Sequence, residues 1–225
     1  MAEGCQLYYI TNRAEFPGDE LTCRRALLAK IAEAARAEVD YIQLREKDLS
    51  ARELERLAQE CVAIIRNLKT EDRELRTRVV INSRTDIALA ASADGVHLRA
   101  NDISPSAARS IWREAAARDS QLAARPWTVA VSCHSPAAVA RAQSQGADFA
   151  VFAPVFEKKD APSVEPRGIE ALREACLAKI PVFALGGVTL ANAAACLSAG
   201  ARGIAGIRLF QQNRVEDVVR ALRKS

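Results

Sequence analysis

Short runs of β-branched and aromatic residues alternate along the chain with longer segments in which apolar residues recur at helical spacing. The short runs predict eight strands, near residues 7–11, 41–45, 78–83, 95–98, 128–133, 149–155, 181–186 and 203–209. The longer segments predict a helix after each strand, over residues 22–37, 51–68, 85–92, 104–118, 136–145, 167–178, 189–199 and 215–224. This alternation indicates parallel strands with helical crossovers, in an open doubly wound sheet or a closed barrel.

Several predicted helices carry start and stop signals. Ser50, Ser104 and Ser135 lie where a hydroxyl is expected to cap the first free N–H groups, and the last two are followed by proline. Gly146 and Gly200 lie where helices are expected to end. These residues support the predicted helix boundaries.

A spacing repeat distinguishes the barrel from the open sheet. The segments EVDYIQL, SADGVHL, GADFAVF and GARGIAG share the order of a small residue, an Asp or Arg, and then a strand. Their first strand positions, Tyr41, Gly95, Phe149 and Gly203, are separated by 54 residues each time. A constant step over two strand–helix units is expected in a ring of alternating strands. We therefore predict a (β/α)₈ TIM barrel as a single domain over residues 1–225.

Composition and charge agree with a globular enzyme. The 225 residues are 49% apolar and 27% charged, which is too hydrophobic for a disordered chain. The net charge of +4 is spread along the sequence, so we expect no nucleic-acid-binding patch, while mild attraction for small anions remains.

The sequence predicts a cytoplasmic protein. No apolar run approaches roughly 18 residues, and the first residues lack the basic and apolar regions of an export signal. We therefore expect neither a membrane span nor export. The cysteines form no C-x-x-C pair or Cys/His cluster, so we expect mostly small buried thiols in a reducing compartment and no zinc; they are Cys5, Cys23, Cys61, Cys133, Cys176 and Cys196.

The fold predicts where functional residues lie, because barrels of this kind bind ligands at the carboxyl ends of their strands. Gln43, Arg45 and Lys47 alternate at the end of the second predicted strand and so share a face. An amide, a guanidinium and an ammonium gathered there suit a phosphate-bearing substrate. A salt-bridged layer inside the barrel is an equally good interpretation of the three residues alone.

A second set of polar residues ends the third and fourth predicted strands. Asn82 and Ser83 end one strand, and Asp102 lies in the loop after the next. One carboxylate with neutral oxygens suits a hydrated Mg²⁺ bridging to substrate phosphates. Asp102 is equally suited to cap the following helix, and the residues alone favour that structural role. His97, inside its strand, is expected to be packed and hydrogen-bonded rather than catalytic.

The fifth predicted strand ends with Ser132 and His134 on one face and Cys133 on the other. A histidine at the barrel mouth is a candidate acid or base near neutral pH. The alternative is a residue that only begins the next helix. Cys133 is expected to be buried and not nucleophilic, because no motif activates it.

Glycines follow the last two predicted strands. Gly186 and Gly187 end the seventh, while Gly206, Ile207 and Arg208 lie in the eighth. Glycines let backbone N–H groups approach an anion closely, and phosphate is often held by these two loops of a barrel. The sequence therefore predicts a phosphate site here.

Taken in order, these motifs resemble thiamine phosphate synthase and the related TenI proteins. The resemblance runs from about residue 6 to residue 210 through QLREKDLS, INSRTDIALAASADGVHL, VSCHS, GADFAVFAPVFEKKDA and PVFALGGVTLANAAACLSAGARGIAGI. It implies a (β/α)₈ barrel and a transferase of thiamine biosynthesis that joins an aminopyrimidine diphosphate to a thiazole phosphate and releases pyrophosphate. It further implies Mg²⁺, phosphorylated pyrimidine and thiazole ligands, and compatibility with a homodimer.

The resemblance assigns roles to matching positions. Gln43, Arg45 and Lys47 match the residues that hold the pyrimidine and diphosphate. Asn82 matches the first residue of an Asn-Asp pair, and Asp102 matches the second metal carboxylate. The remaining matches are Ser132 for pyrophosphate, and the Gly186-Gly187 pair with Gly206 and Ile207 for the thiazole phosphate.

Three departures bear on the activity. Ser83 replaces the first metal-binding aspartate, and Arg208 replaces a serine near the thiazole phosphate. The segment after Val155-Phe156 lacks both threonines of the family's Thr-x-Thr-Lys and leaves Lys158 in the lysine's place. TenI proteins share this loss, so the alternatives are a metal-independent thiazole tautomerase (an isomerase) with His134 as acid and base, or a non-catalytic phosphate-binding barrel. The intact Gln43, Arg45, Lys47 and Asp102 favour the synthase.

Overall fold

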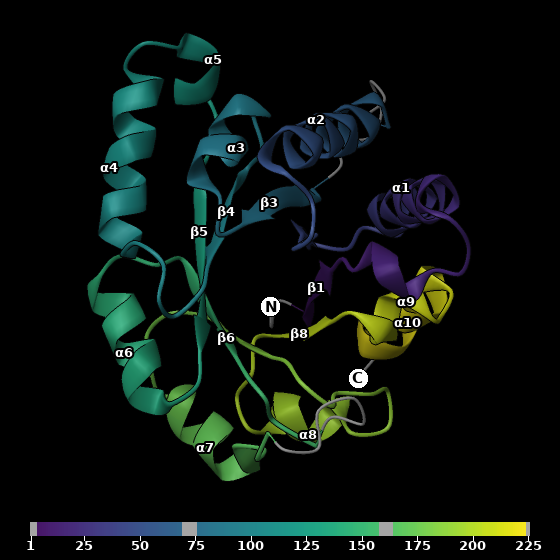
Figure 1. Cartoon of the computed structure of the whole chain (residues 1–225). Coiled ribbons are helices and arrows are strands. Elements are labelled where there is room, and N and C mark those ends of the chain that lie inside the picture. Colours follow the sequence, from purple (N-terminus) through teal and green to yellow (C-terminus); the bar gives the residue numbers. More distant parts are fainter. Residues whose placement is uncertain (1–3, 69–75, 158–163, 224–225) are drawn as a thin grey trace.

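The protein forms a closed barrel of eight parallel strands surrounded by helices, in a computed structural model that describes residues 4–68, 76–157 and 164–223 (Figure 1). The strands follow one another in chain order, and the last pairs with the first to close the ring. They are β1 (Gln6–Ile10), β2 (Tyr41–Leu44), β3 (Arg78–Asn82), β4 (Gly95–Leu98), β5 (Thr128–Cys133), β6 (Phe149–Phe152), β7 (Val182–Ala184) and β8 (Gly203–Gly206). The predicted (β/α)₈ barrel is confirmed.

Each strand leads into one of the predicted helices, which are α1 (Glu20–Arg36), α2 (Ala51–Asn67), α3 (Thr85–Ala90), α4 (Pro105–Ala116), α6 (Pro136–Ser144), α7 (Gly168–Ala175), α8 (Ala193–Ser198) and α10 (Val215–Arg223). Three short helices were not predicted: η1 (Arg13–Glu15), α5 (Ser120–Ala123) and α9 (Arg208–Gln211). Each is about one turn long, so no helical period could appear in the sequence. Within the described residues, no helix is both long and apolar enough to cross a membrane.

The predicted helix ends are confirmed by their hydrogen bonds. The Ser50 hydroxyl accepts the Glu53 N–H while the Glu53 side chain accepts the Ser50 N–H, so the two form a capping box. Ser104 and Ser135 cap α4 and α6 through the N–H groups of the third helical residues. Gly146 and Gly200 follow the ends of α6 and α8 with positive φ angles of 81° and 101°, which glycine adopts without strain.

Three strands are three residues shorter than predicted. β6 ends at Phe152 rather than residue 155, and β7 covers only Val182–Ala184 of the predicted 181–186. β8 ends at Gly206 because Arg208 begins α9 instead of continuing the strand. An apolar run does not show by itself where a buried strand gives way to a turn or a short helix. Of the charged stretch at 69–78, residues 69–75 lie outside the described residues, and β3 begins at Arg78.

The spacing repeat corresponds to one packing layer inside the barrel. Tyr41, Gly95, Phe149 and Gly203 are the first residues of β2, β4, β6 and β8. In barrels of this kind, alternate strands contribute one layer of inward side chains. The rings of Tyr41 and Phe149 lie with centroids 4.8 Å apart, whereas a Cβ on Gly95 or Gly203 would overlap neighbouring backbone oxygens. The layer thus combines two packed aromatic rings with two glycines, at which the neighbouring strands leave no room for a side chain.

The remaining inward side chains complete a separate core within the ring. Tyr8, Val80, Ala130 and Phe183 pack with Phe149 in this inner cluster, and the outward residues of every strand pack under the helices in a second one. The interior is thus filled at the amino-terminal half of the strands. The polar inward residues therefore lie at the carboxyl ends of the strands.

Gly95→Ala tests the layer. A methyl group at this position would meet the carbonyl carbon and oxygen of Thr128 in the neighbouring strand, so we expect a loss of at least about 3 kcal/mol in the free energy of unfolding. Gly4→Ala is the matched control, because a Cβ there has nothing within 4 Å, and its effect should stay within about 0.5 kcal/mol. Urea unfolding followed by circular dichroism measures both, and equal midpoints would contradict the packing described.

Candidate active site

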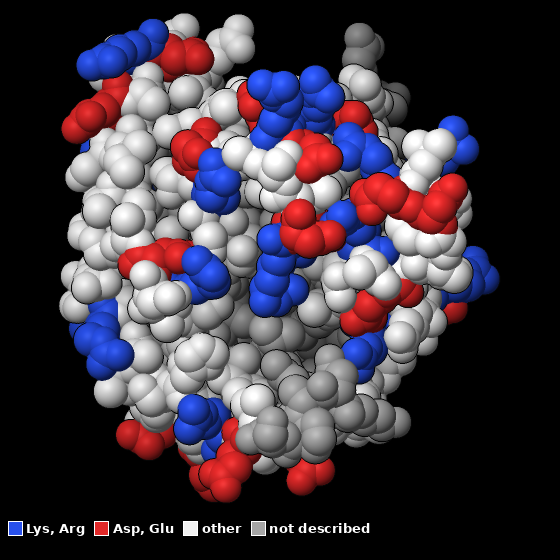
Figure 2. Space-filling view, viewed as in Figure 1, with Lys and Arg blue, Asp and Glu red and all other residues white. Residues whose placement is uncertain are grey.

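Polar inward side chains gather at the carboxyl ends of β2, β3, β4 and β5. In space-filling form the face viewed in Figure 1 is hollowed at its centre, and Lys and Arg side chains stand at the edge of the hollow (Figure 2). The residues predicted from the sequence to meet at one rim do so: Gln43, Arg45, Asn82 and Ser132 all follow the inward alternation of their strands.

A directed chain of hydrogen bonds connects the rim from β2 to the residue after β3. The buried Gln43 donates Nε2–H to Asn82 Oδ1 over 2.9 Å, and Asn82 donates Nδ2–H to Ser83 Oγ over 3.2 Å. The amides of Gln43 and Asn82 are therefore oriented before any ligand binds.

The Asp102 carboxylate closes a tight turn. It accepts the Arg99 N–H over 2.8 Å and forms an ion pair with the Arg99 guanidinium over 3.0 Å. Burial alone would raise the pKa of Asp102, but the hydrogen bonds from Arg99 and Ser83 outweigh burial and lower it, so the group is ionised at neutral pH. Ser104, not Asp102, caps α4, so the helix-cap interpretation was wrong.

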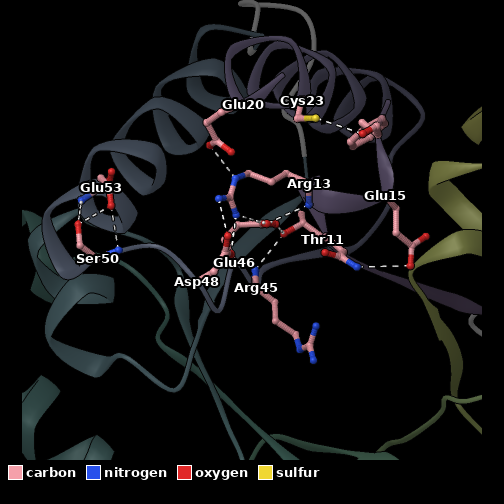
Figure 3. Close-up of polar contacts among 12 residues, drawn as sticks. Thr11, Arg13, Glu15, Glu20, Cys23, Arg45, Glu46, Asp48, Ser50 and Glu53 are labelled. Atoms are coloured by element: carbon pink, nitrogen blue, oxygen red, sulfur yellow. Dashed lines mark hydrogen bonds and ion pairs between the residues drawn. The ribbon is translucent and has the colours of Figure 1, made fainter. Parts of the chain in front are cut away.

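The Arg45 guanidinium points into the hollow, away from the cluster of ion pairs behind it (Figure 3). Its backbone N–H donates to Thr11 Oγ1 over 2.9 Å, but within the described residues the guanidinium has neither a hydrogen bond nor an ion pair. Burial, together with the charge of Arg99, lowers the pKa of Arg45, whose usual value is far above neutrality, so the charge persists. A half-buried cation without a counter-ion is a strong anion site. Lys47 lies exposed two residues further on.

An ion-pair network centred on the buried side chains of Arg13 and Glu46 joins the loops after β1 and β2 (Figure 3). Glu46 Oε1 accepts the Thr11 hydroxyl over 2.5 Å, and Glu46 Oε2 accepts both the backbone N–H of Arg13 over 2.9 Å and its guanidinium over 3.3 Å. Arg13 also binds Asp48 through two hydrogen bonds of 2.7 Å and Glu20 through one of 2.8 Å. Burial raises the pKa of Glu46 even though these donors favour its charged form.

This network was missed by the sequence analysis. Glu46 stands inside the QLREK motif, but it points away from the rim and serves the loop rather than a ligand. The only signal in the sequence was its alternation with Arg45 and Lys47, which places it on the other face.

His97 lies fully inside the barrel between two hydroxyls, as expected. Its Nδ1 is 2.7 Å from the Tyr8 hydroxyl, and its Nε2 is 2.7 Å from Ser132 Oγ. Burial lowers the pKa of His97 to about 3, and the charge of Arg45 contributes to the same shift against the opposing effect of Asp102. The ring is therefore neutral at physiological pH.

The loops after β7 and β8 present free backbone donors. Gly186 and Gly187 have positive φ angles of 93° and 67°, and a Cβ on Gly187 would overlap the Glu157 carbonyl and lie 2.7 Å from the Phe156 Cβ. Within the described residues, no backbone oxygen or side chain accepts the N–H groups of Gly187 or Ile207. Gly206 is the buried last residue of β8. These two loops suit an anion.

The other predicted site residues differ in their exposure and in the contacts that their side chains make. His134 is exposed, and its Nδ1 is 2.7 Å from the Ala153 carbonyl oxygen. Arg208 begins α9 and its Nε lies 3.3 Å from Glu15 Oε1, so part of its charge is already balanced. Cys133 is buried, and burial raises its pKa to about 11, in agreement with a thiol that is not a nucleophile. Lys158 lies outside the described residues.

The chain is similar over most of its length to proteins of one family. A sequence profile described as thiamine monophosphate synthase matches residues 7–210. The putative thiamine-phosphate synthase 2 of Aquifex aeolicus is 35% identical over 206 residues, which cover 91% of this chain and 97% of that protein. The thiamine-phosphate synthase of Methanospirillum hungatei is 40% identical over 205 residues, 89% of this chain and 87% of that one. The solved structure of thiamine phosphate pyrophosphorylase from Pyrococcus furiosus has a TM-score of 0.74 and 28% identity, and the match covers 97% and 94% of the two chains.

Arg13→Met tests the buried network. It would leave the Glu46 carboxylate, whose side chain is 1% exposed, without its cation, so we expect a loss of about 3–5 kcal/mol in the free energy of unfolding. Arg84→Met removes an exposed ion pair with Asp86 and should cost less than about 1 kcal/mol. Urea unfolding at neutral pH compares the two; a loss no larger for Arg13→Met than for Arg84→Met would show that the network does not hold the loops.

Proposed function

Because the chain belongs to the thiamine monophosphate synthase family, we propose that it is a transferase that joins an aminopyrimidine diphosphate to a thiazole phosphate and releases pyrophosphate. The observation that carries the proposal is the rim itself. An unpaired, half-buried Arg45 stands beside the Gln43–Asn82 amide chain, and the free backbone donors of Gly187 and Ile207 belong to other loops of the same rim. The site thus offers two anion-binding regions and an amide pair.

The first region suits the diphosphate of the pyrimidine substrate. In the reaction, the bond between the pyrimidine methylene carbon and the diphosphate oxygen breaks, and the departing pyrophosphate keeps the electron pair. Negative charge therefore grows on that oxygen. Arg45 and Lys47, with Lys158, would stabilise it, and Ser132 would donate a hydrogen bond. Gln43 and Asn82 would hold the edge of the pyrimidine ring, because both present amide groups at the inner side of the rim.

The second region suits the thiazole phosphate. Its ring nitrogen supplies the electron pair for the new C–N bond, so the phosphate must be anchored where the nitrogen faces the methylene carbon. The backbone N–H groups of Gly187 and Ile207 would bind that phosphate, between Gly186 and Gly206, as barrels of this class commonly do. Arg208, partly balanced by Glu15, would add charge at the edge of the region.

The donor set at Asp102 fits a hydrated Mg²⁺. It consists of one ionised carboxylate and the Ser83 hydroxyl, which helps to lower the pKa of that carboxylate, and the described residues contain no cluster of three acidic, His or Cys side chains that could hold a metal without help. Mg²⁺ usually keeps several waters and takes the rest of its ligands from one or two carboxylates and substrate phosphates. Asp102 and Ser83 would hold the ion, and the ion would supply positive charge to the diphosphate.

A thiazole tautomerase is the second candidate, and the state of His134 favours it. Its Nδ1 is held by the Ala153 carbonyl, and within the described residues Nε2 has no partner, so this nitrogen is available to move a proton. The replacement of a metal carboxylate by Ser83 points the same way. Against it stand Arg45 and Asp102, which a tautomerase would not need. We also propose a cytoplasmic setting, supported by six free thiols.

A reconstitution assay tests the synthase. With both substrates and Mg²⁺ we expect thiamine phosphate and pyrophosphate in equal amounts, and Arg45→Ala should lower kcat by ~10²–10³ because one preorganised contact to developing charge is lost. Arg84→Ala, on the surface, is the matched control and should leave kcat unchanged. No turnover at high enzyme concentration would refute the synthase. Metal-independent isomerisation abolished by His134→Ala would indicate the tautomerase, and binding without either reaction a non-catalytic barrel.

Gly187→Val tests the thiazole phosphate region. The new side chain would overlap the Glu157 carbonyl and force a positive φ on a β-branched residue. The loop must therefore move, and its N–H groups would no longer point toward the phosphate. We expect the affinity for thiazole phosphate to fall at least ten-fold in isothermal titration calorimetry, with the pyrimidine affinity retained. An unchanged thiazole phosphate affinity would show that the phosphate binds elsewhere.

A further inference from the structure

A buried pair of side chains behind Ser132 has no role in the reaction as proposed so far. Tyr8 on β1 and His97 on β4 are 0% and 2% exposed, and both reach across the interior of the barrel. His97 pairs in register with Ala130, so Ser132, two residues further along β5, is its neighbour on the inner face nearest the rim. The three residues form one line of hydrogen bonds from the core to the site.

We infer that Tyr8 fixes the tautomer of His97, and that His97 in turn makes Ser132 a hydrogen-bond donor toward the departing pyrophosphate. Tyr8 and His97 are positioning residues in this arrangement, because neither reaches the substrate. The inference rests on the proposed function for its ligand, but the state of the three side chains can be measured without it.

The hydrogen of the Tyr8 hydroxyl determines which atom donates in the hydrogen bond between Tyr8 and His97. Tyr8 lies among the rings of Tyr41, Phe149 and Phe183, and within the described residues His97 Nδ1 is the one hydrogen-bond partner of its hydroxyl. Burial raises the pKa of Tyr8 well above its usual value, with a further contribution from Tyr41, so the phenol keeps its hydrogen. That hydrogen can be satisfied only if Nδ1 accepts it.

The two other states of the ring leave a buried group unsatisfied. If Nδ1 carried a hydrogen, in the other neutral tautomer or in the charged ring, it would donate to the Tyr8 oxygen. The phenol hydrogen would then have no acceptor in an apolar interior, at a cost of about 1–3 kcal/mol. The arrangement with Tyr8 as donor, Nδ1 as acceptor and Nε2 protonated has no such cost. It leaves Nε2–H facing Ser132 Oγ, 2.7 Å away.

The tautomer of His97 determines how the Ser132 hydroxyl is oriented. Its oxygen accepts from Nε2–H, so its own hydrogen is not used by the ring, and within the described residues it has no other acceptor. Ser132 is half-buried at the rim, at the same end of the barrel as Arg45, whose charge acts on the His97 ring. A hydroxyl aimed this way donates to an incoming anion. With the opposite tautomer, Ser132 would donate to the ring and present its lone pairs to the anion instead.

Nitrogen-15 NMR on the whole protein reads the tautomer directly. The chain has two histidines, so a comparison of histidine-labelled wild type with His134→Ala assigns the His97 ring. We expect a bare Nδ1 and a protonated Nε2 in long-range proton–nitrogen spectra at neutral pH without substrate. A protonated Nδ1, in either the neutral or the charged ring, would overturn the inference whatever the protein's activity.

Kinetics test the effect on the reaction. Tyr8→Phe removes one hydroxyl, so the tautomer of His97 is no longer fixed. We expect kcat to fall roughly ten-fold, which is less than the ~10²–10³ that the loss of a whole preorganised donor costs. The KM for thiazole phosphate should stay unchanged. Tyr9→Phe is the matched control, because Tyr9 is equally buried, faces the outer core and finds no hydrogen-bond partner for its hydroxyl among the described residues. It should leave kcat unchanged.

Coupling to Ser132 separates positioning from general packing. If Tyr8 acts through Ser132, Tyr8→Phe combined with Ser132→Ala should be no slower than Ser132→Ala alone. Additive losses, or a Tyr8→Phe enzyme with wild-type kcat, would overturn the inference. Absence of synthase turnover in the wild type would refute the proposed function and the pyrophosphate role together, while the NMR measurement would still decide whether Tyr8 fixes the tautomer.

Discussion

The closed barrel depends on filling a narrow interior with side chains of unequal size. Tyr41 and Phe149 pack against each other in one layer, and Gly95 and Gly203, the other members of that layer, cannot gain a side chain without overlapping a neighbouring backbone. Because aromatic rings fill the amino-terminal half, polar inward residues can lie only at the carboxyl ends. The packing that closes the ring therefore also determines the end at which a ligand can bind.

Two arginines near this rim differ in how their charge is balanced. Arg13 is surrounded by Glu20, Glu46 and Asp48 and fastens the loops after β1 and β2. Arg45, on the inner side of the same loop, forms no ion pair within the described residues. The buried network thus holds the loop in place and leaves the other cation for a substrate. This arrangement suits a reaction in which negative charge develops on a leaving group.

Hydrogen bonds across the rim also have a direction. One chain runs from Gln43 through Asn82 to Ser83, and each amide donates to the next side chain. By the inference above, a second chain begins at Tyr8 and passes through His97 to Ser132. Buried polar groups need hydrogen-bond partners. The pairing inside the barrel therefore determines whether each polar group at the rim faces the ligand as a donor or as an acceptor. The rim is ordered before substrate arrives.

The sequence by itself determined the eight strands, the eight main helices and their caps, because hydrophobic period and turn chemistry are local. It also determined the closed ring, since the 54-residue spacing repeats a packing layer, and it brought Gln43, Arg45, Asn82 and Ser132 to one rim through alternation alone. Only the tertiary structure decided how those residues are paired. Glu46 with Arg13 and Tyr8 with His97 are contacts set by the distance between side chains from separate turns and strands. Residue type and spacing within one segment do not contain that distance.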